Sequence, residues 1–173
     1  HQHWTRVICC PATEKPAEPS GNGLVIVTGD MPPEHDQLTL GADNDWLLLQ
    51  VGGLRHVQVN TSGKAVLQQV PELRTVNGSG PGLSLEVYEA PVLKRISGTG
   101  HRVTLYQKRA TAKELTIADN WQHARIHSTV LKSLNFANGE SLALHHCNKL
   151  QQVNLPLGID VECFGALPAP LMA

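Results

Sequence analysis

Short segments in which apolar and polar residues alternate run through most of this chain, and they restrict its fold more than any other feature. Leu83–Tyr88 and Arg102–Lys108 are two examples. Alternation with a period of two places one set of side chains on each face of a β-strand. Turn-forming dipeptides such as Gly52-Gly53 and Asn138-Gly139 separate the segments. Because Asn-Gly between two alternating segments favours a two-residue turn, we expect hairpins at these points.

About ten short strands of this kind predict an all-β fold, built as a single sandwich or barrel. We expect one β-rich domain over residues 1–173, with a Pro/Gly-rich loop at 11–23 and an irregular C-terminal tail at 165–173. No repeat of fixed period is evident, which argues against a propeller or a solenoid. Strands do not alternate with long helical patterns, which argues against a Rossmann-type sheet.

One segment, residues 117–134, has two interpretations. Asp119 or Asn120 could cap a short helix that begins near Trp121. The same residues also alternate, with Ala124 and Ile126 on one face, as they would in a strand. The helix is slightly favoured, so we predict at most one short helix near 119–132.

The composition excludes several classes of protein. Hydrophobic residues make up 41% and charged residues 17% of the chain, as in a folded soluble protein. The longest apolar runs are too short to cross a bilayer, so we expect no membrane insertion. The net charge of −1 gives no general attraction to nucleic acid, so we expect no nucleic-acid partner. An extracellular location and a place within a larger assembly both fit this composition.

Charge is unevenly distributed along the chain. Residues 1–50 carry a net charge of −5, and the remainder therefore carries +4. Between Pro91 and Lys113 there are six basic residues and no acidic one. A local basic surface can bind an anion or an acidic partner. We predict a contact with a protein partner, or between copies of the chain, and its candidate residues are Lys94, Arg95, Arg102, Lys108 and Arg109.

Nine histidines make metal binding the second possibility. An N-terminal amine, its own imidazole and a second histidine suit copper, and paired histidines suit zinc. The candidate ligands are His1, His3, His123, His127, His145 and His146. A mature N-terminal histidine on a β-sandwich resembles the copper monooxygenases that attack polysaccharides, and this resemblance rests on His1 alone.

The cysteines give a third, weaker possibility. Cys147 follows two histidines and would face outward if the strand through Leu144 continued to alternate, so it could be a nucleophile. The redox state of all four cysteines (Cys9, Cys10, Cys147 and Cys163) is open. Because no spacing of residues demands catalysis, we predict a non-catalytic β-domain that acts as a binding module, an accessory subunit or a structural component of a larger assembly. The alternative is a histidine-dependent copper or zinc protein, which could be an enzyme.

Overall fold

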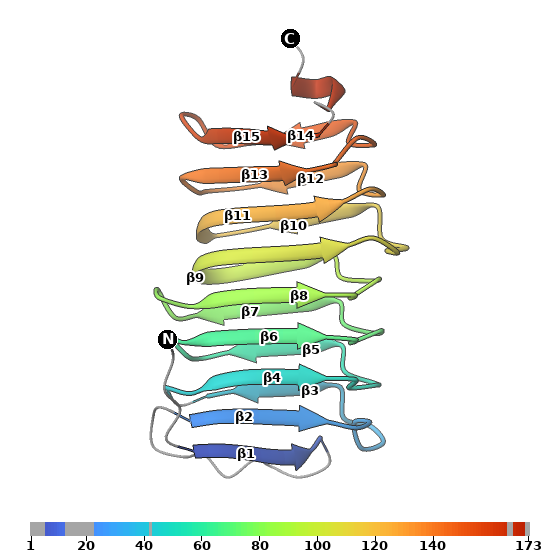
Figure 1. Cartoon of the computed structure of the whole chain (residues 1–173), viewed down its shortest axis with the longest axis vertical. Helices are drawn as coiled ribbons and strands as arrows, with labels where there is room; N and C mark the ends of the chain where they lie inside the picture. The colour runs from blue at the N-terminus through green and yellow to red at the C-terminus, as the bar shows by residue number, and fades with distance from the viewer. Residues whose placement is uncertain (1–5, 13–22, 42, 166–167, 172–173) are drawn as a thin grey trace.

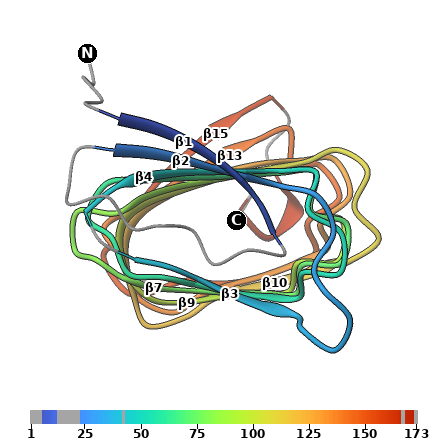
Figure 2. The same cartoon turned by 90° about the horizontal axis from the view of Figure 1, so that it is seen from below.

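The chain is a parallel β-solenoid of about eight turns (Figure 1). The computed structural model describes residues 6–12, 23–41, 43–165 and 168–171. Most turns contribute one strand to a front sheet and one strand to a back sheet, as the two are seen in Figure 1. Seen along the axis, the turns form a flattened ring whose two long sides are the sheets (Figure 2).

The two sheets have the following members. The front sheet contains β1 (Arg6–Pro11), β2 (Gly23–Thr28), β4 (Asp45–Leu49), β6 (Lys64–Gln68), β8 (Ser84–Tyr88), the second half of β9 (Arg95–Gln107), β11 (Asn120–Ser128), β13 (Ser141–His145) and β15 (Asp160–Phe164). The back sheet contains β3 (Gln37–Leu40), β5 (His56–Val59), β7 (Thr75–Ser79), the first half of β9, β10 (Glu114–Ile117), β12 (Ser133–Phe136) and β14 (Gln152–Asn154).

Every pair of neighbouring strands is parallel, and the register aligns equivalent residues of successive turns. Leu24 pairs with Asp45, a separation of 21 residues, whereas Ser84 pairs with Arg102 after only 18. Because the number of residues per turn varies, the repeat is irregular in the sequence although it is regular in space.

The core is filled by the inward-facing residue of each alternating pair. In β6 and β8 these residues are Ala65, Leu67, Leu85 and Val87, which are all fully buried. The same alternation in the other turns builds one continuous cluster, in which Trp46, Trp121 and Phe136 are the largest fully buried side chains. Alternation therefore sets the depth of each residue in a solenoid as it does in a sandwich.

A left-handed residue turns the chain at the end of several front strands. Gln50, Gln69, Glu89 and His146 have φ angles between 55° and 57°. The N–H of Gln69 donates to the carbonyl of Tyr88 in the next turn, 3.2 Å away. The residue directly after each of these positions, such as Val70, is buried and faces the core. This geometry turns the chain without any hairpin.

These observations correct the predicted architecture. The all-β prediction is confirmed, but the sandwich or barrel of about ten strands is wrong, because the chain forms a solenoid with 15 strands. The expected hairpins are also wrong: Gly52-Gly53 and Asn138-Gly139 join strands that lie in different sheets. Each strand pairs with the strand one full turn away, and local turn residues cannot reveal that partner.

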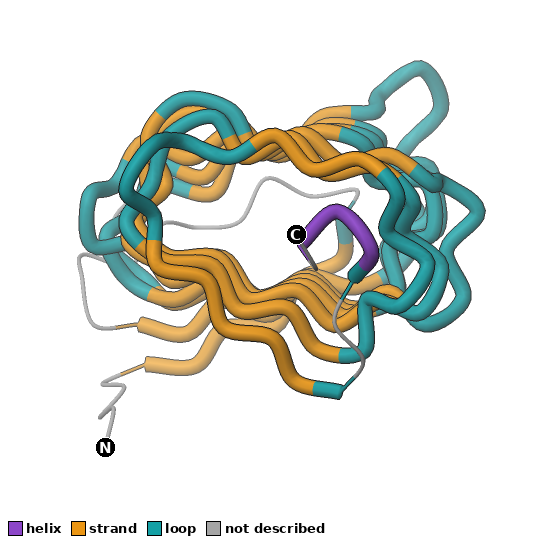
Figure 3. The backbone as a smooth tube through the Cα atoms, turned by 90° about the horizontal axis from the view of Figure 1, so that it is seen from above, coloured by secondary structure: helices purple, strands orange, loops and turns teal. Residues whose placement is uncertain are grey.

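The predicted helix near 119–132 is wrong as well. Asn120–Ser128 form the strand β11, whose residues pair with both β9 and β13. Asp119 does not cap a helix; its carboxylate accepts a hydrogen bond from the N–H of Gly98 at 2.8 Å. The only helix of the described residues is a 3₁₀ turn, Ala169–Leu171, in the C-terminal tail (Figure 3). Most of the predicted loop at 11–23 lies outside the described residues.

Glycine permits one close contact inside the solenoid. The long strand β9 crosses from the back sheet to the front sheet through Gly98 and Gly100. The fully buried ring of Trp121 lies against Gly100, and its indole N–H donates to the carbonyl of Ser97 at 3.1 Å. A methyl group at Gly100 would overlap the indole ring.

Candidate binding site

The corner between the ends of the front strands and the starts of the back strands carries a column of cations. A basic residue follows the buried corner leucine in four turns: Leu54-Arg55, Leu73-Arg74, Leu93-Lys94 and Leu131-Lys132. Lys113 lies at the same corner in the intervening turn, where its carbonyl accepts hydrogen bonds from Lys132 and Ser133. We call Arg55, Arg74, Lys94, Lys113 and Lys132 the basic column; all five are exposed.

Backbone hydrogen bonds fix the spacing of the column. The N–H of Arg74 donates to the carbonyl of Arg55 at 2.8 Å, and the N–H of Lys94 donates to that of Arg74 at 2.9 Å. Successive members therefore start from backbones about 4.8 Å apart. Between Lys94 and Lys113 the register shifts by two residues, because Thr116 and not Glu114 pairs with Arg95.

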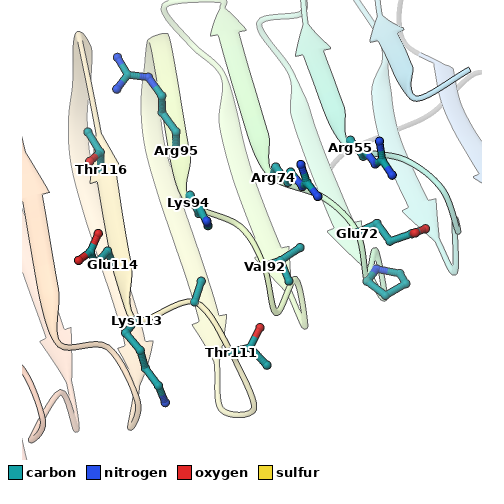
Figure 4. Close-up of a pocket in the computed structure, with 12 residues that line it drawn as sticks. Arg55, Glu72, Arg74, Val92, Lys94, Arg95, Thr111, Lys113, Glu114 and Thr116 are labelled. Atoms are coloured by element: carbon teal, nitrogen blue, oxygen red, sulfur yellow. The ribbon is translucent and has the colours of Figure 1, made fainter.

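A groove of about 870 Å³ opens beside the basic column. Four of the five column residues line it, together with Arg95 and the hydroxyl-bearing Thr111 and Thr116. Figure 4 shows Arg55, Arg74 and Lys94 on successive turns of this wall. The groove thus presents cations along its length and hydroxyl groups at one end.

The groove also contains two carboxylates. The carboxylate of Glu72 accepts a hydrogen bond from the backbone N–H of Gly53, which ties it to the corner. Glu114 is exposed beside Lys113. In the described part of the chain the ion pairs within 4.0 Å are Lys64–Glu86 and His123–Glu140, so no column cation has a carboxylate partner. The wall therefore carries an excess of positive charge.

The structure divides the basic residues that the sequence predicted as one site. Lys94 and Arg95 line the groove of the basic column, while Lys108 and Arg109 line a second groove of similar volume. Pro71 lies between the two and contributes to both. Arg102 begins a front-sheet strand whose opposite end reaches Lys108, so about 20 Å of extended chain separates them.

Arg55, Arg74, Lys113 and Lys132 are column residues that the sequence analysis did not name as candidates. A signal for three of them does exist, since Arg55, Arg74 and Lys132 each follow a leucine that recurs at similar spacing along the chain. It could be used only after the repeat was known, because the three residues are far apart in sequence and no charge run links them.

A column of stacked rings lies at the ends of the front strands, on the outer face. Its members are Tyr88, Tyr106, His127, His145 and Phe164, one from each of five turns. Adjacent ring centroids are 3.9 to 4.6 Å apart, and the planes of adjacent rings differ by at most 15°. We call these five residues the ring column. Because the rings cover one another's faces, they leave mainly edges for a ligand.

Two histidines inside the ring column are held neutral. Burial, reinforced by the neighbouring His145 and Arg125, lowers the pKa of His127 to about 4. Burial also lowers the pKa of His145. The Nε2 atoms of both rings are buried, and neither has a hydrogen-bond partner in the described part of the chain. The two imidazoles therefore serve as neutral planar groups that stack on their neighbours in the ring column.

The other candidate metal ligands are dispersed. His123 lies on the outer face of β11, where its Nδ1 is 2.7 Å from the hydroxyl of Ser141. His146 is exposed at a corner. Within the described residues, no group of three or more His, Cys, Asp or Glu side chains could hold a metal ion. His1 and His3 lie outside the described residues.

Cys147 does not have the environment predicted for a nucleophile. The left-handed turn at His146 breaks the alternation that begins at Leu144, so Cys147 faces the core and is 1% exposed. Its thiol lies 3.5 Å from the carbonyl of Ile126, and burial raises its pKa. A buried, protonated thiol is a poor nucleophile.

No family model matches the chain, and no curated protein or solved structure is significantly similar to it. Among the described residues, no helix is long and apolar enough to span a membrane.

Proposed function

We propose that the chain is a non-catalytic binding module whose contact surface is the corner with the basic column and its two adjoining grooves. The observation that carries this proposal is the placement of five exposed cations at one corner on successive turns, with no carboxylate partner for any of them among the described residues. Like charges aligned on neighbouring strands destabilise a sheet. Their alignment is understandable if an acidic partner neutralises them, and stacked repeats commonly present extended binding surfaces.

The side chains that could act as a nucleophile or a general base are buried or stacked, which favours a binding role over catalysis. Cys147 is buried with a raised pKa, while His127 and His145 are packed between other rings. By contrast, the side chains of the corner are exposed and open to a partner. A partner that contacts this corner would meet both grooves, which share Pro71.

The proposal can be tested by capture from extracts of the protein's own source, with three immobilised variants beside the native chain. Arg74→Glu/Lys94→Glu alters the first groove, and Lys108→Glu/Arg109→Glu alters the second. Arg102→Glu/Arg125→Glu makes the same change in net charge on the outer face of the front sheet, away from both grooves. A component that the native chain and the front-sheet control retain, and that either corner variant loses, supports the proposal. Equal retention by all four proteins, or by none, contradicts it.

A further inference from the structure

We infer that the ligand of the basic column is one acidic polysaccharide chain, which lies along the solenoid axis and carries carboxylate groups on its sugars. This inference rests on the proposed binding function and adds the chemical class of the ligand. It depends on four features of the corner: the length of the basic column, its spacing, its hydroxyl groups and its lack of aromatic residues.

The length of the basic column favours an extended ligand, although Lys113 and Lys132 are displaced by two residues from the line of the other three. The five cations lie on five successive turns, which spans about 19 Å at the usual spacing of parallel strands. A compact anion such as a single phosphate would contact only one or two of them. An extended chain can contact all five, and so recover the electrostatic cost of aligning like charges.

The spacing of the cations argues against two other extended polyanions. Successive turns lie about 4.8 Å apart, whereas an extended acidic peptide places side chains on one face only every ~6.7 Å. Duplex DNA carries one charge per ~1.7 Å of its axis, which is far denser than the column. Neither polymer matches the spacing of the turns.

The chemistry of the groove agrees with the spacing. Thr111 and Thr116 bring hydroxyl groups to the wall that Arg95 and Lys113 also line, and such groups can exchange hydrogen bonds with sugar hydroxyls. No aromatic residue lines this groove. Single-stranded nucleic acid is bound through bases that stack on aromatic side chains, so the groove lacks what that ligand needs.

A second copy of the chain is a poor occupant of the corner. A two-fold axis at the centre of the basic column would place Lys94 against its own copy, Arg74 against Lys113 and Arg55 against Lys132. Every column residue would then face another cation. The repulsion along such a contact disfavours a second copy of the chain at this corner.

The experiment measures the affinity of the full chain for four polymers: alginate, neutral dextran, poly-L-glutamate and single-stranded DNA. We expect alginate to bind most tightly, with an affinity that falls as salt is added. We expect Arg74→Glu/Lys94→Glu to weaken alginate binding by about tenfold or more. Arg102→Glu/Arg125→Glu, with the same change in net charge, should change it by less than about twofold.

Each other outcome overturns the inference in a recognisable way. Equal or tighter binding of poly-L-glutamate or DNA shows that the ligand class is wrong, while a binding role for the corner stands. Equal loss in both double variants shows that net charge, and not the basic column, governs binding. If none of the four polymers binds, the column is no polyanion site; the capture experiment then decides separately whether the corner binds anything else.

Discussion

At the scale of single residues, His127 shows how the fold restricts the charge of a side chain. Its ring lies between Tyr106 and His145, with centroids 4.2 and 3.9 Å away. Arg125, His146 and Lys108 add positive charge nearby. Burial and these cations together lower the pKa of His127 to about 4 from the ordinary 6.5. Between these two pKa values, the imidazole of His127 is protonated in the unfolded chain but not in the folded chain.

This difference predicts an acid-dependent loss of stability. Between pH 6.5 and about 4 the unfolded state carries more protons than the folded state, so the free energy of unfolding falls as the pH falls. His127→Phe keeps a flat ring in the ring column and removes the titrating group, so we expect a shallower decline. Urea unfolding at several pH values measures this. His35→Gln, an exposed histidine outside the ring column, is the control and should keep the native slope. A native slope in His127→Phe would contradict the assignment.

The left-handed corner residues give a second prediction at this scale. Gln69 has a φ of 55°, a conformation that costs a residue with a Cβ roughly 1–2 kcal/mol and costs glycine almost nothing. Glycine also loses more entropy on folding, so the net gain from Gln69→Gly is about 0.5–1 kcal/mol. The neighbouring Gln68→Gly, placed in the extended strand β6, should instead lose roughly that amount. Chemical denaturation of both variants checks the two signs.

At the scale of the element, glycine decides where a strand can pass close to a large side chain. Gly100 lies against the indole of Trp121, and neither the ring nor the strand has room for a methyl group. We expect Gly100→Ala to lower the free energy of unfolding by about 1–3 kcal/mol or more, as overpacked cores do. In the control Gly82→Ala, the nearest atom to the new methyl would be the Ser62 carbonyl oxygen at 3.2 Å, so a small change is expected. Equal losses would show that the indole contact is unimportant.

The sequence allowed the strands to be predicted but not their partners. Leu85 and Val87 alternate with polar residues and are buried as expected. The turn at Asn138-Gly139 was also recognisable, yet a turn between two strands is compatible with a hairpin and with a solenoid corner. The spacing of paired residues varies from 18 to 21 in neighbouring turns, which hides the repeat. The helix prediction at 119–132 failed because tertiary pairing overrode a cap signal at Asp119.

The candidate site was predictable only in part, and for the same reason. Lys94 and Arg95 stand in a visible basic stretch, and both line the groove. Arg74 and Arg55 enter the site because the register places them one and two turns below Lys94, respectively. Cys147 was assigned to the wrong face because the alternation of apolar and polar residues does not reveal the positive φ of His146. The site could therefore be predicted only once the register between successive turns was known.

At the scale of the whole molecule, each turn contacts only the turns before and after it, so stability is distributed along one axis. The middle turns have fully buried core residues such as Leu67 and Leu85. In the last turn, Val153 and Val161 are only partly buried, and β15 pairs with β13 alone. Less apolar burial and fewer backbone hydrogen bonds mean a lower free energy of local opening at that end.

Hydrogen exchange should therefore proceed from the ends of the axis toward its middle. We expect amides of β1, β14 and β15 to exchange first and those of β6, β8 and β11 last, because opening a terminal turn disrupts one interface whereas opening a middle turn disrupts two. Mass spectrometry of peptides along the chain measures this order. Bound alginate should slow exchange in the turns of the basic column while leaving β15 unchanged, because β15 lies beyond Lys132. Uniform exchange along the axis would show that the solenoid opens as a single unit and would contradict the turn-by-turn description.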